Sequence, residues 1–139
     1  MVVRRLEVKD IFDLFGFVDD SHQISMELAL MLCGGEKPSH PCAQIYGAFE
    51  GAEMVSMITA TYCVVYPHKD GTKIVQLSGA YTKESERGKG YASAILEMIE
   101  HDAKVYFNAD YLCCDSSADE LYYKHGFKKS DESRLWKPL

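Results

Sequence analysis

The sequence predicts an α/β domain in which helices flank a central, mostly antiparallel sheet. Two observations lead to this prediction. Strand-like segments with alternating or continuous apolar residues fill the middle of the chain, and segments with apolar residues at helical spacing stand on either side of them. A third observation sets the number of domains, because 139 residues suffice for one hydrophobic core. We therefore expect a single domain over residues 1–139.

The N-terminal part is expected to hold one strand and two helices. Residues 2–6 form a short apolar and basic run suited to an opening strand. Asp10 is placed to cap a helix that Gly16 ends or weakens, and an apolar stripe predicts a second helix over residues 23–33.

Three strands should follow. Residues 43–50 and 54–65 form a β-hairpin around a turn at 51–52, and residues 72–82 return as the third strand. Gly79, inside this third strand, marks a bulge or a close approach of another backbone.

The C-terminal part alternates helices and strands. We expect a helix over residues 90–104, a strand over 111–114 that a right-handed crossover would make parallel to its predecessor, and a short helix over 117–124. One small hairpin fits into residues 127–139. The resulting order is β-α-α-β-β-β-α-β-α-β-β.

Composition excludes several classes of protein. The formal net charge of −6 disfavours a nucleic-acid partner, which would need a basic face. No apolar run reaches the roughly 18 residues of a membrane span and no signal peptide is evident, so we expect a cytoplasmic protein without a membrane partner. The five cysteines and five histidines lack the short paired spacings of a zinc site, so we expect reduced cysteines and no metal.

The loop at residues 87–92, Arg-Gly-Lys-Gly-Tyr-Ala, is the strongest candidate for a ligand site. Its glycines let the backbone approach a ligand closely, and the helix that follows offers unpaired N–H groups and a partial positive charge. Arg87 and Lys89 add further positive charge. We therefore expect a phosphate group to bind there.

Two other phosphate-binding loops fit poorly. A P-loop would require a glycine where the chain has Lys83 and a hydroxyl residue where it has Gly90. A dinucleotide fingerprint would require a third small residue, which Ser93 supplies only loosely, and an acidic residue at the end of the next strand, whereas Asp110 precedes that strand. A nucleotide-binding domain is a third possibility, which binding tests with ATP and NAD would decide.

Two motifs in order carry a family resemblance. The loop matches the pattern R/Q-x-x-G-x-G/A, and residues 118–127 match A-x-x-L-Y-x-K-x-G-F, one crossover helix and one strand later. Both patterns resemble those of the GCN5-related N-acetyltransferases (GNAT). The order of elements is similar to that family's fold along the whole chain, although the motifs lie within residues 72–127.

The resemblance implies acetyl transfer from acetyl-CoA to a primary amine by direct attack in a ternary complex, without a metal. In that family, amides of the loop hold the pyrophosphate of coenzyme A, and main-chain groups of the preceding strand contact the pantetheine arm and the thioester carbonyl. The arm enters where that strand splays from the next one. The cofactor-binding residues would then be Ala80, Thr82, Arg87, Gly88, Lys89, Gly90, Tyr91 and Ala92.

Tyr122 matches the tyrosine that commonly protonates the departing thiolate in this family. A phenol, with a pKa of about 10, holds its proton at neutral pH and can release it to a thiolate whose thiol has a pKa of about 8.5. The other interpretation is an aromatic ring that packs the short helix against the sheet, which fits Tyr123 equally well.

The chain also departs from the family pattern. Asp115 stands where many relatives carry an asparagine that contacts the pantetheine arm, so this contact is left open. Residues 72–82 lack the carboxylate that many relatives use as a base; the base is absent, is a water chain or comes from elsewhere, with His68 and Asp70 as loop candidates. A non-catalytic acyl-CoA-binding or regulatory module is therefore the alternative. The acceptor is a small-molecule or peptide amine that the sequence does not identify, and a homodimer would be in keeping with the family.

Overall fold

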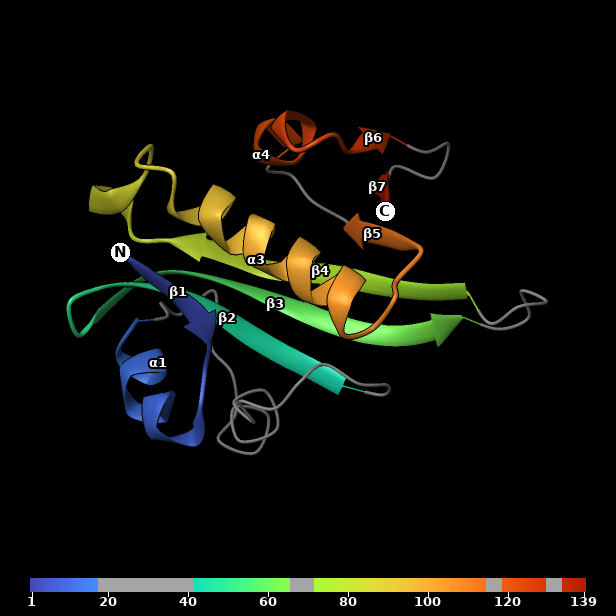
Figure 1. Cartoon of the computed structure of the whole chain (residues 1–139). Helices are drawn as coiled ribbons and strands as arrows, with labels where there is room; N and C mark the ends of the chain where they lie inside the picture. The colour runs from blue at the N-terminus through green and yellow to red at the C-terminus, as the bar shows by residue number, and fades with distance from the viewer. Residues whose placement is uncertain (18–41, 66–71, 115–118, 130–133) are drawn as a thin grey trace.

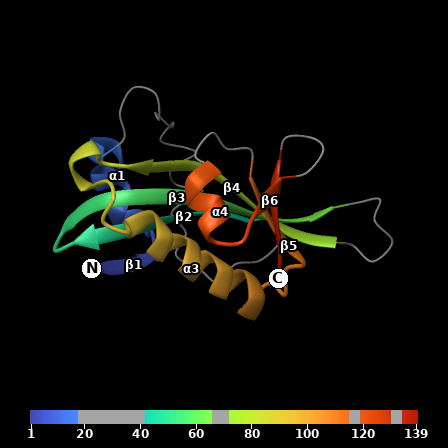
Figure 2. The same ribbon diagram turned by 90° about the horizontal axis from the view of Figure 1, so that it is seen from above.

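The computed structural model describes residues 1–17, 42–65, 72–114, 119–129 and 134–139, and its strands form one seven-stranded sheet in the order β1-β2-β3-β4-β5-β7-β6. Helix α3 runs along one face of this sheet (Figure 1, Figure 2). The elements are β1 (Val2–Arg5), the 3-10 turn η1 (Val8–Asp10), α1 (Ile11–Phe17), β2 (Cys42–Glu50), β3 (Glu53–Val65), β4 (Thr72–Thr82), the 3-10 turn η3 (Glu84–Glu86), α3 (Tyr91–Val105), β5 (Tyr111–Cys114), α4 (Asp119–Lys124), β6 (Lys128–Lys129) and β7 (Leu135–Pro138).

The pairing of the strands confirms the predicted mixed sheet. Strands β1 to β4 are antiparallel neighbours, and β5 lies parallel to β4 after the crossover through α3. The expected C-terminal hairpin is present as β6 and β7, and β7 also pairs with β5. The helix expected over residues 23–33 lies outside the described residues.

The N-terminal prediction needs one correction. Asp10 directly precedes α1, but its carboxylate accepts hydrogen bonds from the Glu7 N–H (2.7 Å) and from both terminal nitrogens of Arg4 (2.7 and 2.8 Å). It therefore closes the turn before the helix and does not cap the helix itself. Gly16 lies inside α1, one residue before Phe17, the last helical residue described.

Strand β4 is irregular near its C-terminal end. The pairing with β3 shifts so that Ile58 alone faces Gly79 and Ala80, and Gly79 has a φ of +61°. The predicted bulge at Gly79 is thus confirmed. On its other side β4 pairs with β5 only up to Leu77, opposite Cys114. Strand β5 ends at Cys114, so residues 78–82 have no β5 partner among the residues described.

The main core lies between α3 and the sheet. The buried helix positions include Ile95, Leu96, Ile99 and Ala103, as the helical spacing predicted. A smaller core on the other face packs α1 against β2 and β3, and it contains Leu14, Phe17, Ile45, Phe49 and Met57. Opposite faces of β2 thereby hold α3 and α1, as alternation along a strand requires.

A polar cluster is buried within the α3 core. The Asp102 carboxylate, 3% exposed, accepts a hydrogen bond from the Tyr46 hydroxyl at 2.7 Å, and the Tyr46 and Tyr62 hydroxyls are 2.6 Å apart. Burial of Tyr46 raises its pKa far above the usual value for a phenol. Because Asp102 belongs to α3 and the tyrosines to β2 and β3, this cluster fixes the helix on the sheet.

The structure describes the side chains of Cys63, Cys113 and Cys114, and none of these three forms a disulfide, as expected. Within the same part, no group of three or more histidine, cysteine, aspartate or glutamate side chains could hold a metal ion. None of the helices described is both long and apolar enough to cross a membrane.

Candidate acyl-coenzyme A site

The loop before α3 leaves backbone donors unpaired. Gly88 and Gly90 have φ angles of +78° and +87°, which L-residues rarely adopt, and Gly90 is the N-cap of the helix. The first helical hydrogen bond runs from the Ala94 N–H to the Gly90 carbonyl at 3.1 Å. The N–H groups of Tyr91, Ala92 and Ser93 therefore have no acceptor among the residues described, and they are available to an anion.

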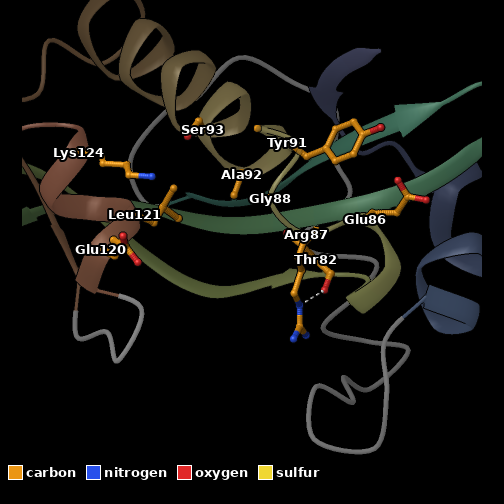
Figure 3. Close-up of a pocket in the computed structure, with 11 residues that line it drawn as sticks. Thr82, Glu86, Arg87, Gly88, Tyr91, Ala92, Ser93, Glu120, Leu121 and Lys124 are labelled. Atoms are coloured by element: carbon orange, nitrogen blue, oxygen red, sulfur yellow. Dashed lines mark hydrogen bonds between the residues drawn. The ribbon is translucent and has the colours of Figure 1, made fainter.

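These donors border a cleft of about 380 Å³ between the loop and α4 (Figure 3). Three residues of α4 form the opposite wall, Glu120, Leu121 and Lys124. Reasoning from the sequence did not select them. Their i, i+1, i+4 spacing on a short helix directly after the parallel strand was the available signal. The cleft is lined by Thr82, Glu86, Arg87, Gly88, Gly90, Tyr91, Ala92, Ser93, Glu120, Leu121 and Lys124.

The two cations of the loop are differently placed. The Arg87 Nε donates to the Thr82 carbonyl at 3.0 Å, and this side chain lines the cleft. The Lys89 ammonium instead pairs with the Glu86 carboxylate at 2.8 Å, which raises the pKa of Lys89, and Lys89 is not among the lining residues. Of the two basic residues predicted to serve phosphate, the structure thus brings only Arg87 to the cleft.

Thr82 is the last residue of β4 and lines the cleft. The N–H of the next residue, Lys83, donates to the Val55 carbonyl of β3 at 3.0 Å, so the main-chain groups of Thr82 face away from β3. The Thr82 hydroxyl lies 2.7 Å from the Ser56 hydroxyl on β3. Ala80, the other predicted main-chain contact, lies in the bulge opposite Ile58 and does not line the cleft itself.

Tyr91 connects the start of α3 to the end of β2. Its side chain is only 8% exposed and its hydroxyl donates to the Glu50 carboxylate at 3.0 Å. In Figure 3 the ring points away from α4. The contribution of Tyr91 to the cleft is therefore chiefly its backbone.

Tyr122 and Tyr123 differ sharply in burial. Tyr122 is 1% exposed and packs edge to face against Phe127, with 5.2 Å between ring centroids, whereas Tyr123 is 45% exposed. The packing contact predicted as one role is therefore present for Tyr122 and not for Tyr123. Proton donation by Tyr122 stays a prediction. Asp115, His68 and Asp70 lie outside the described residues.

The structure combines a mixed seven-stranded sheet with a crossover helix whose open N-terminus borders a cleft, which is the class of fold that the sequence predicted. Residues 42–129 match the family model for the acetyltransferase (GNAT) domain. The chain belongs to the GNAT family.

Solved structures show the same fold. An acetyltransferase of the GNAT family from Streptococcus pneumoniae superposes with a TM-score of 0.75 at 17% identity, covering 99% of both chains. A predicted acetyltransferase with acetyl-CoA from Clostridium acetobutylicum gives 0.67 at 21% identity, covering 94% of this chain and 92% of that one. A probable N-acyltransferase from Enterococcus faecalis gives 0.73 at 18% identity; the match covers 92% of this chain but only 32% of that protein. No curated protein matches the sequence significantly.

Proposed function

We propose that this protein transfers an acetyl group from acetyl-CoA to a primary amine of a small molecule or peptide. One observation carries the proposal, the cleft of about 380 Å³ whose wall holds the unpaired N–H groups of Tyr91, Ala92 and Ser93. Three backbone donors at the N-terminus of a fifteen-residue helix suit a pyrophosphate group.

Several features of the site fit coenzyme A. A Cβ atom at Gly88 or Gly90 would meet no atom within 4 Å, so space for a ligand remains beside both glycines. Beyond Leu77 no described residue of β5 pairs with β4, and a pantetheine arm could bind along this part of β4, beginning at the bulge that contains Ala80. The Clostridium neighbour with acetyl-CoA supports the choice of acyl donor.

The reaction follows from the chemistry of a thioester. The amine nitrogen attacks the carbonyl carbon, a C–N bond forms, and the C–S bond breaks. The attacking nitrogen loses one proton to a base or to water, and the departing thiolate takes one proton, which we assign to the Tyr122 hydroxyl. Main-chain N–H groups at the end of β4 would stabilise the negative charge that develops on the carbonyl oxygen.

A non-catalytic acyl-CoA-binding module is the second candidate, and one observation favours it. Strand β4 has no carboxylate to serve as a base. The two glutamates that line the cleft stand beside the phosphate-binding donors, and one of them, Glu86, is paired with Lys89. Turnover separates the two candidates.

The test combines binding with turnover. Calorimetric titration should show acetyl-CoA binding, and release of free thiol should reveal acetylation within a panel of amines. Tyr122→Phe should lower kcat about 100- to 10,000-fold and leave acetyl-CoA affinity within a few-fold. Tyr123→Phe, on the exposed neighbour, is the matched control and should behave like the wild type. Acetyl-CoA binding without acetylation of any amine would favour the binding module, and absence of binding would refute both.

A further inference from the structure

The Ser56 and Thr82 hydroxyls share one hydrogen bond, and either of them could be its donor. Ser56 is 0% exposed, and the Thr82 hydroxyl oxygen, 2.7 Å away, is its hydrogen-bond partner among the residues described. Only one of the two hydroxyls can donate across this contact. Whichever hydroxyl accepts must place its own hydrogen elsewhere.

Burial decides between the two directions. If Thr82 donated, the Ser56 hydrogen would be buried with no acceptor among the residues described, and a buried unpaired donor carries its full desolvation cost. If Ser56 donates, the remaining hydrogen belongs to Thr82, which is only half-buried and lines the cleft. The second arrangement leaves no donor unpaired in the core, so the Thr82 hydrogen is the one directed outward.

The surroundings of Thr82 indicate what accepts that hydrogen. Thr82 shares its cleft with the unpaired N–H groups of Tyr91, Ala92 and Ser93 and with the Arg87 side chain. The cleft also holds two carboxylates, but Glu86 is paired with Lys89 and Glu120 lies on the opposite wall, so the groups named beside Thr82 are donors. The ligand atoms beside them are then acceptors, and a hydroxyl bonds most strongly to a charged oxygen. Main-chain contact by Thr82 was expected from the sequence, whereas a role for its side chain was not.

We propose that Thr82 donates its hydroxyl hydrogen to a phosphate oxygen of coenzyme A, and that Ser56 is the positioning residue that fixes this direction. The inference rests on the proposed function, because coenzyme A is its ligand. It assigns a polar binding group to the end of β4 and gives the buried serine of β3 a functional purpose.

The test is calorimetric titration of the wild type and four variants with coenzyme A. Thr82→Val, which keeps the shape and removes the hydroxyl, should weaken binding about tenfold, whereas Thr82→Ser should stay within about twofold. Ser56→Ala should weaken binding by roughly two- to fivefold, because the Thr82 hydroxyl loses its fixed orientation. In the Thr82→Val background, Ser56→Ala should cause no further loss of affinity.

Thermal unfolding of the free proteins checks the hydrogen-bond direction independently. Thr82→Val should lower Tm because Ser56 loses its acceptor, and the double variant should recover most of this loss because both partners are then apolar. The phosphate is tested with 4′-phosphopantetheine and pantetheine as competitors of coenzyme A. Thr82→Val should weaken only the phosphorylated competitor.

Each failure has a separate meaning. A wild type that does not bind coenzyme A refutes the proposed function. A wild type that binds, with Thr82→Val binding equally well, refutes this inference alone. If Thr82→Val weakens both competitors equally, the acceptor lies in the pantetheine arm and the phosphate assignment is wrong. If Ser56→Ala weakens coenzyme A binding by the same factor in the Thr82→Val background as in the wild type, Ser56 does not act through Thr82 and is merely structural.

Discussion

Ser93→Glu tests the anion site at the start of α3 without weakening the fold. Ser93 is the third residue of the helix, lines the cleft and has an N–H group without an acceptor. A glutamate in the first turn of a helix interacts favourably with the helix dipole by about 0.3–1 kcal/mol. The free variant should therefore unfold at the same temperature as the wild type or slightly higher, and any loss of binding cannot be attributed to unfolding.

The size of the effect follows from Coulomb's law. A carboxylate about 5 Å from a phosphate is repelled by about 3 kcal/mol at an effective dielectric constant of about 20 and by about 0.8 kcal/mol in water. The cleft is open to solvent, so we expect about 1–2 kcal/mol. Affinity for coenzyme A should then fall roughly 5- to 30-fold.

The assay is calorimetric titration with coenzyme A at low and at high salt. Ser93→Gln is the matched control, because it adds a side chain of the same size without charge and should bind within a few-fold of the wild type. The difference between the two variants should shrink as salt screens the repulsion. Equal affinities for Ser93→Glu and Ser93→Gln at low salt would show that phosphate does not bind at this helix terminus.

Two further predictions concern stability. The hydrogen bonds from Arg4 lower the pKa of Asp10 below its usual value, so the carboxylate stabilises the fold above pH of about 4 and loses this effect as the pH falls through its folded pKa. Asp10→Asn should lower the free energy of unfolding by about 1–3 kcal/mol at pH 7, since Arg4 is partly exposed. In urea unfolding, this difference from the wild type should disappear in acid, and a difference that stays constant with pH would contradict the ion pair. Gly90→Ala should lower the free energy of unfolding by about 1 kcal/mol because the φ angle of Gly90 is +87°. Gly16→Ala is the matched control, because Gly16 lies inside α1 and its added Cβ likewise meets no described atom within 4 Å; it should be neutral or stabilising by up to about 1 kcal/mol. Equal Tm values for both variants would argue against the left-handed conformation of Gly90.

Much of the fold could be predicted because its signals are local. The strand that follows the hairpin was predicted at residues 72–82, and β4 has these bounds. The bulge at Gly79 could be predicted because glycine is the residue that tolerates positive φ. The helix expected from residue 90 begins at Tyr91, with Gly90 as its N-cap. The motifs likewise placed the loop with unpaired backbone donors, since these donors depend on a helix start that the sequence specifies.

The missed features depend on how the chain folds around turns and how its elements pack, which residue types and spacing do not show. Asp10 was predicted to cap a helix because nothing local shows that Arg4 folds back onto it across the intervening turn. Lys89 was predicted to serve phosphate, yet its pairing with Glu86 depends on the 3-10 turn before the loop. The bond between Tyr46 and Asp102 joins residues 56 positions apart, and the packing of α3 on the sheet brings them together.

The two polar attachments of α3 determine how firmly its N-terminus is held. Tyr91 at the first turn is bonded to Glu50 on β2, and Asp102 near the last turn is bonded to Tyr46 on the same strand. These attachments are about 17 Å apart along the helix axis. Sliding the helix along that axis would break both bonds together. The helix is therefore bonded to β2 near both of its ends, and its open N–H groups keep one position relative to that strand before any ligand binds.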